Sequence, residues 1–142
     1  MMMLARRDRE WFLAAFADHI NGCNLSSPGV PMSQREKFHE WNGIWVQSHA
    51  DVEDLELFEE LYVRVDGERL RVYPWTGWKR GTSDPLLVCL MDLGTVSSGS
   101  PGEAERRVQS LVQQGWDYKA REGALRAVHV DDLEKIPLRR NP

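Results

Sequence analysis

The sequence predicts an α+β fold, in which helices pack on one sheet of about five mostly antiparallel strands. Two observations carry this prediction. Apolar residues recur at helical spacing in three segments, and an Asp-Gly pair separates two segments in which apolar and polar residues alternate. The expected order of elements is ααββ followed by βαββ. Residues 1–142 form a single domain, because no long linker, internal repeat or low-complexity segment divides them.

Two helices are expected in the first third of the chain. The first covers residues 8–22, where one helical face carries a stripe of mostly apolar residues. The stripe consists of Phe12, Ala15, Phe16, His19 and Cys23. The second helix is expected to begin at Ser33, because Glu36 three residues later completes a capping box. Its stripe consists of Phe38, Trp41, Trp45 and His49.

A β-hairpin is the clearest element of the middle of the chain. Residues 51–60 fit either a helix or a strand, but residues 61–65 and 70–73 alternate as strands do and flank Asp66-Gly67. This pair tolerates the positive φ angles of a two-residue turn. The resulting register places Leu61, Val63, Leu70 and Val72 on one face and Tyr62, Arg64, Arg69 and Arg71 on the other.

The second half of the chain is expected to add a central strand, a helix and a second hairpin. Residues 86–91 are apolar throughout, as a strand covered on both faces is. The helix begins with Pro101 at its first position, has a capping-box spacing from Ser100 to Glu103, and stops at Gly115. Its buried stripe is Ala104, Val108, Leu111 and Val112. The final elements are a hairpin of residues 116–120 and 125–130, a helical turn at 131–135 and a frayed end.

Composition limits the class of protein. The net charge of −4 and the pI near 5.6 argue against a protein that coats nucleic acid by bulk electrostatics. No stretch approaches the roughly 18 apolar residues of a transmembrane helix, and charges follow the first residues too soon for a signal peptide, so we expect no membrane association. Cys23 and Cys89 are interpreted as reduced core thiols, which predicts a cytoplasmic protein.

No set of residues predicts a catalytic or metal site. His19 and Cys23 have ligand-like spacing on the first expected helix, but no second pair of ligands follows, so core packing is favoured and no metal or cofactor is expected. His129 lies beside Asp131 and Asp132 and could act as a base, but no nucleophile motif accompanies it. These patterns favour a non-catalytic protein.

One alternative is an enzyme or a nucleotide- or anion-binding domain that uses the strand, loop and helix at residues 86–104. A loop from Gly94 to Gly102 after a buried strand opens onto a helix N-terminus, where backbone N–H groups bind anions, and Asp92 supplies an acid. The lysine of a phosphate-binding loop is absent, however, and Glu103 already places a negative charge there. A plain connection is the favoured interpretation.

The stronger functional signal is a basic and aromatic segment after the Asp-Gly turn. Its residues are Arg69, Arg71, Tyr73, Trp75, Trp78, Lys79 and Arg80. Cations among aromatic rings anchor protein partners or stack on single-stranded nucleic acid, which is a second alternative function. The competing interpretation is that Trp75 and Trp78 fold back as a small core. The preferred hypothesis requires both rings to be exposed.

An acidic segment precedes the same hairpin. Its candidate binding residues are Glu53, Glu56, Glu59 and Glu60. Such a run is usually a solvated face, and its functional interpretation is the steering of a basic partner. Together the two segments predict a small intracellular protein that binds another protein, as an inhibitor, an immunity-type protein or an adaptor does.

Overall fold

The chain folds mainly as β-sheet in a computed structural model that describes residues 2–16, 22–79, 81–82, 84–91, 101–119 and 123–139. Eleven strands in these residues join one antiparallel sheet, and α2 (Pro101–Gln113) is the only α-helix there. The strands are β1 (Met2–Arg7), β2 (Glu10–Phe16), β3 (Gly22–Ser27), β4 (His39–Trp41), β5 (Ile44–Asp51), β6 (Glu56–Val65), β7 (Glu68–Trp78), β8 (Leu86–Met91), β9 (Asp117–Lys119), β10 (Gly123–His129) and β11 (Glu134–Pro137). The expected α+β fold with about five strands is therefore wrong.

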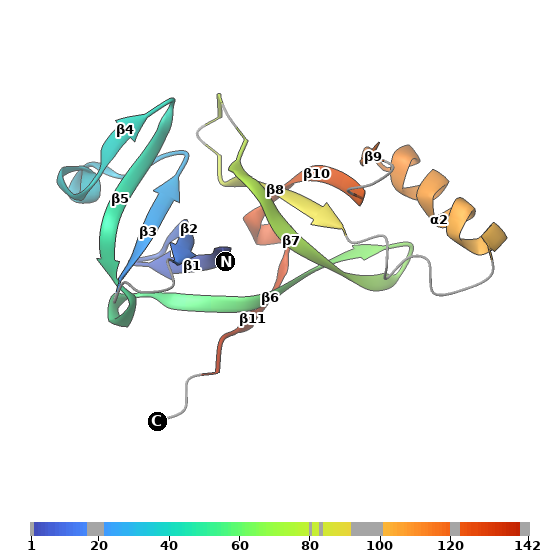
Figure 1. Ribbon diagram of the computed structural model, residues 1–142, viewed down its shortest axis with the longest axis horizontal. Helices are drawn as coiled ribbons and strands as arrows, with labels where there is room; N and C mark the ends of the chain where they lie inside the picture. The colour runs from blue at the N-terminus through green and yellow to red at the C-terminus, as the bar shows by residue number, and fades with distance from the viewer. Residues whose placement is uncertain are drawn as a thin grey trace.

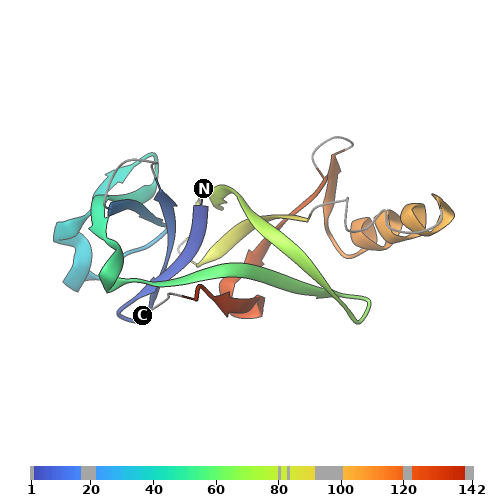
Figure 2. The same ribbon diagram turned by 60° about the horizontal axis from the view of Figure 1, so that its bottom comes forward.

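The sheet forms two lobes that share the long strand β6 (Figure 1). The N-terminal lobe contains β1 to β5 and the start of β6, and the C-terminal lobe contains the rest of β6 with β7 to β11 and α2. The strand order is β4-β5-β3-β2-β1-β6-β7-β8-β10-β9, and β11 pairs separately with β6. Phe58 pairs with both Leu4 and Pro137, so β1 and β11 lie on opposite edges of β6. Figure 2 shows β6 running from one lobe to the other.

The helix expected over residues 8–22 is wrong, because a tight turn interrupts it. Asp8 and Arg9 have φ angles of 51° and 69° and connect β1 to β2 in a two-residue hairpin turn without glycine. Phe12 and Leu13 are both buried but belong to different hydrophobic clusters. Because both faces of β2 are covered, the strand lacks the polar alternation that would have identified it.

The helix expected from Ser33 to His49 is also wrong. A short 3₁₀ helix, η1 (Met32–Lys37), is followed by a hairpin of β4 and β5 that turns at Asn42-Gly43, where φ is 51° and 79°. Pro31 precedes η1 and no side chain caps its start, so the expected capping box does not form. The Asn-Gly pair, a strong hairpin signal, outweighs the helical pattern.

The hairpin expected around Asp66-Gly67 is confirmed in both turn and register. Leu61 pairs with Val72 and Val63 with Leu70, and the two turn residues have φ angles of 51° and 80°. The ambiguous residues 51–60 divide into a 3₁₀ turn, η2 (Val52–Asp54), and the start of β6.

The expected central strand is confirmed, since β8 lies between β7 and β10. The expected helix is α2, and it ends as predicted: Gly115 has a φ of +95°, its N–H donates to the Val112 carbonyl at 3.1 Å, and the Trp116 N–H donates to Leu111 at 3.0 Å. Val112 is 51% exposed, so the expected buried stripe is wrong at that position. Ser100 lies outside the described residues.

The end of the chain follows the prediction only in part. β9 and β10 form the expected hairpin. The expected helical turn at 131–135 starts one residue earlier as a 3₁₀ turn, η3 (Val130–Asp132). The residues after it form a strand that was not predicted, β11, because Glu134 and its neighbours pair with β6 from Phe58 to Tyr62.

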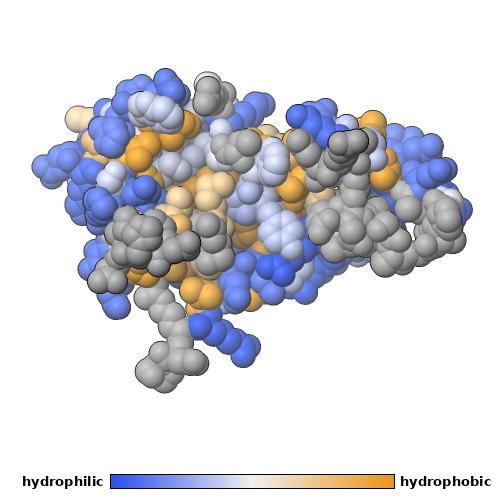
Figure 3. Space-filling view, in the orientation of Figure 1, coloured by the Kyte–Doolittle hydropathy of each residue, from blue (hydrophilic) through white to orange (hydrophobic). Residues whose placement is uncertain are grey.

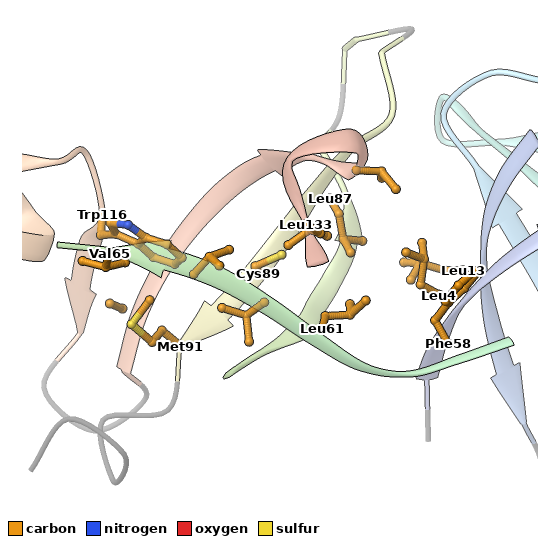
Figure 4. Packing of buried hydrophobic residues seen from close by; sticks show 14 of the residues in the cluster. Leu4, Leu13, Phe58, Leu61, Val65, Leu87, Cys89, Met91, Trp116 and Leu133 are labelled. Atoms are coloured by element: carbon orange, nitrogen blue, oxygen red, sulfur yellow. The ribbon is translucent and has the colours of Figure 1, made fainter. Parts of the chain in front are cut away.

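Each lobe has a hydrophobic core, and the larger one extends across the junction. The N-terminal core includes Phe12, Phe38 and Leu57. Figure 4 shows the larger core, in which side chains from β6, β8 and η3 meet residues of β1 and β2. Trp78 joins this core, and its indole N–H donates to the Ser26 carbonyl of β3 at 2.8 Å. This bond ties β7 to the N-terminal lobe.

Candidate functional site

The predicted basic residues of the hairpin lie in a polar layer on its outer face. Arg69 forms a 2.7 Å ion pair with Glu134 of β11, and its guanidinium lies 3.7 Å from the centre of the Tyr62 ring. The Tyr62 hydroxyl donates to Glu60 at 2.7 Å, which raises the pKa of Tyr62. Glu60 also lies 3.7 Å from Arg71. Arg69 and Arg71 thus already have carboxylate partners.

The expected exposure of both tryptophans is wrong for Trp78, which is only 5% exposed. Its N–H needs an acceptor when buried, and the Ser26 carbonyl supplies one inside the junction of the lobes. Trp75 is half-buried, whereas Tyr73 is 39% exposed beside the Arg71 guanidinium. Lys79 is exposed, and Arg80 lies outside the described residues.

The predicted acidic residues face solvent around η2 and the start of β6. Glu53, Glu56 and Glu59 are exposed, and Glu60 is half-buried beneath its arginine and tyrosine partners. The backbone N–H of Glu53 donates to the Asp51 carboxylate at 3.0 Å, which caps η2. These carboxylates form a solvated edge rather than an enclosed site.

Most of the other predicted candidates lie outside the described residues, and the one that is described has a structural role. His19, Asp92 and the loop from Gly94 to residue 100 lie outside the described residues. His129 has a structural partner, because its Nδ1 accepts from the Asp131 N–H at 3.2 Å at the start of η3. Within the described ranges, no group of three histidine, cysteine or acidic residues could hold a metal ion.

Two further sequence predictions concern the thiols and membrane spans. Cys23 and Cys89 are both free and buried, as predicted. Among the described residues, no helix has the length and apolar character needed to cross a membrane.

A cavity of about 800 Å³ opens in the C-terminal lobe between β6 and β10. We call it the groove. Residues 62–65 of β6 form one wall and residues 126–129 of β10 the other, while Trp116 and Leu133 also line it. Figure 3 shows that, on one face of the molecule, apolar side chains gather mainly in the middle and hydrophilic ones cover the ends.

Both walls of the groove are strand edges that have no described pairing partner. On β10, the partner strand β9 reaches only Leu125, so residues 126–129 pair with β8 alone. On β6, the partner strand β11 reaches only Tyr62, so residues 63–65 pair with β7 alone. The two edges therefore offer backbone hydrogen-bonding groups to whatever occupies the groove.

The registers identify which backbone groups face the groove. Hydrogen-bonded and non-hydrogen-bonded pairs alternate in antiparallel strands, and the residues flanking a two-residue turn are hydrogen-bonded. Val65 and Glu68 flank the turn, so the N–H and C=O of Arg64 point away from β7. On β10, the Val130 N–H donates to the Pro85 carbonyl at 3.1 Å, so Val130 and Pro85 form a hydrogen-bonded pair. By the same alternation, the backbone N–H and C=O groups of Ala127 and His129 point away from β8.

Arg126 lines the groove and is the one charged side chain among the described residues on its face of β8 and β10. It pairs with Cys89, which is fully buried, and shares a face of β10 with Ala124 and Val128. The other described positions on this face of β8 and β10 are apolar: Leu87, Cys89, Met91, Ala124 and Val128. The Arg126 side chain is exposed through the mouth of the groove and has no described ion-pair partner.

The floor and one end of the groove are fixed by buried groups. Trp116 is 3% exposed, and its indole N–H has no described acceptor. At the other end, Lys135 donates to the carbonyls of Val130 and Leu133 at 2.9 and 2.8 Å and holds η3 in place. Burial lowers the pKa of this lysine. Asp132, which is exposed, lines the same end.

No family model, curated protein or solved structure matches this chain. Its function is therefore argued from the groove and the surface beside it. Sequence reasoning missed the groove, although one signal was present: Arg126 lies in the same alternating phase as Val128 within the expected strand 125–130.

Proposed function

We propose that this protein is a non-catalytic protein-binding module, whose groove receives an extended segment of a partner protein. The observation that carries the proposal is that two strand edges to which no described strand is paired, residues 63–65 and 126–129, line one cavity of about 800 Å³. An extended segment placed there gains main-chain hydrogen bonds from the edges and apolar contacts from Val63, Val65 and Leu133.

The predicted hairpin surface fits this proposal as a second contact area. Tyr62, Arg64 and Glu134 belong both to the wall of the groove and to the outer layer of the hairpin. A partner bound in the groove would therefore continue over Arg69 and Arg71, which the ion pairs already hold in position. Ordered side chains lose less conformational entropy on binding, which favours affinity.

Selection of peptides followed by hydrogen exchange tests the proposal. Random decapeptides displayed on phage are selected on the whole protein, and backbone exchange is measured with and without the best peptide. We expect the amides of Arg64, Ala127 and His129 to exchange rapidly in the free protein and to slow at least tenfold when the peptide is bound.

A proline variant gives a second measure of the same contact. Ala127→Pro removes an N–H that points into the groove without removing a bond to β8, whereas Ala127→Thr keeps that N–H. Only the proline variant should lose peptide binding while circular dichroism stays unchanged. If no peptide protects these amides, or if the selected peptides bind both variants equally, the proposal is wrong.

A further inference from the structure

We infer that the bound segment carries an acidic side chain in its middle, that Arg126 binds this side chain, and that apolar residues flank it two positions away on each side. The inference rests on the proposed function, since it names the chemistry of the segment that the groove would receive. It begins from the one cation that projects from the inner face of β10 in the described part of the chain.

The surroundings of Arg126 favour a carboxylate over other groups. The described residues give this guanidinium no acidic partner, whereas Arg69 has Glu134 at 2.7 Å. Arg126 shares its face of β10 with Ala124 and Val128 and pairs with Cys89, so no other described side chain on this face of β8 and β10 competes for its hydrogen bonds. A guanidinium in such a place binds a planar carboxylate with two charge-assisted bonds, which are about twice as strong as neutral ones.

The position of Arg126 along the groove indicates where the acidic side chain lies. β10 runs from Gly123 to His129, and Arg126 is its central residue. An extended segment beside β10 would thus meet Arg126 with an internal side chain rather than with its terminal carboxylate. Because side chains alternate along a strand, the next residues that point inward lie two positions away on each side.

Apolar walls lie where those flanking side chains would point. Val63 and Val65 of β6, Val128 of β10 and Leu133 after η3 line the groove around Arg126. Trp116 also lines the groove but is only 3% exposed, so it shapes the groove more than it contacts the segment. Arg126 is an exposed, charged donor without a described acceptor, which suits a segment that brings an acceptor of its own.

Parallel selections on three proteins test the inference. The decapeptide library is selected on the wild type, on Arg126→Gln and on Arg106→Gln. Arg106 is an exposed arginine of α2 that does not line the groove, so its variant is the matched control. We expect peptides from the wild type and from Arg106→Gln to share an Asp or Glu with apolar residues at both second neighbours. Peptides selected on Arg126→Gln should lack the acidic residue and keep the apolar pair.

Affinities of synthetic peptides then measure the contact itself. The best wild-type peptide and its analogue with Gln in place of the acidic residue are compared by fluorescence anisotropy. We expect the Gln analogue to bind the wild type with about tenfold lower affinity than the acidic peptide does, and to bind Arg126→Gln with less than twofold lower affinity. Asp132→Asn, which removes a carboxylate from the same groove, should not weaken the acidic peptide.

The outcomes separate this inference from the proposed function. Peptides that protect the amides of Arg64 and Ala127 but show no acidic preference would overturn the inference and leave the protein-binding groove in place. An acidic preference that survives in Arg126→Gln would do the same. A selection that yields no peptide in the groove would overturn both.

Discussion

Replacing Trp78 by phenylalanine should destabilise the whole protein, because this side chain connects the two lobes. The variant removes the indole N–H that donates to the Ser26 carbonyl at 2.8 Å. It also leaves a cavity inside the core, because Trp78 is only 5% exposed. The lost hydrogen bond accounts for about 1 kcal/mol. The apolar atoms removed and the cavity they leave account for about 2 kcal/mol more.

Urea denaturation followed by far-ultraviolet circular dichroism measures this loss. A decrease of about 3 kcal/mol in the free energy of unfolding corresponds to a fall of about 10 °C in Tm for a chain of this size. Trp41→Phe is the matched control, because Trp41 is 64% exposed at the β4–β5 hairpin and its replacement should cost less than about 0.5 kcal/mol. Equal losses in the two variants would refute the assignment of Trp78 to the junction.

Three further predictions concern backbone geometry and the buried thiols. Gly67→Ala places a side chain in open space at a φ of +80° and should cost about 1 kcal/mol in urea melts. Gly123→Ala brings a Cβ within 2.5 Å of the Met91 carbonyl at a φ of +122° and should cost more than about 3 kcal/mol, so equal costs would contradict the close approach of β10 to β8 at this position. Burial raises the pKa of the Cys23 and Cys89 thiols, the latter to about 12, so a disulfide reagent at neutral pH should label neither thiol until urea unfolds the chain.

The raised pKa of Cys89 also has a consequence for stability at high pH. The thiol ionises near 9 in the unfolded chain and near 12 in the fold, so its contribution to stability is complete below pH 9 and decreases between pH 9 and 12. The decrease is about 1.4 kcal/mol per pH unit. The difference in the free energy of unfolding between wild type and Cys89→Ala, measured against pH, isolates this contribution. If the two proteins lose stability in parallel above pH 9, the burial of the thiol is contradicted.

The sequence predicted the elements whose local signals agree with the fold. Asp66-Gly67 and the alternation around it specify both turn and register, and Gly115 supplies the positive φ that ends α2. The apolar run of β8 was recognisable because strands pair with it on both edges and side chains cover it. In each case a backbone requirement and a pattern of burial indicate the same structure.

The first third of the chain could not be predicted in this way, because its local signals conflict with its tertiary contacts. Asp8 and Arg9 form a turn with positive φ angles but without glycine, so the sequence lacks the usual residue that indicates such a turn. Phe12 packs on Phe38 of a distant segment with ring centres 5.6 Å apart, and this contact decides the face that β2 buries. The capping-box spacing at Ser33 also favoured a helix that ran across Asn42-Gly43, so the turn at this pair was not predicted.

The candidate site was beyond local prediction for a similar reason. The groove exists because β9 and β11 stop short of covering the edges of β10 and β6. Where a neighbouring strand stops depends on the assembled sheet. Trp78 illustrates the same limit, since its acceptor at Ser26 lies 52 positions away along the chain.

The long strand β6 couples the stability of the two lobes. Its first residues complete the sheet of one lobe by pairing with Arg6 and Leu4, and its last residues complete the other by pairing with Glu68. Heat or denaturant should therefore melt both in a single cooperative step, without an intermediate that keeps one half intact. A polypeptide that stops before Glu56 would lack a wall of its own core, so proteolytic halves should not persist as folded pieces.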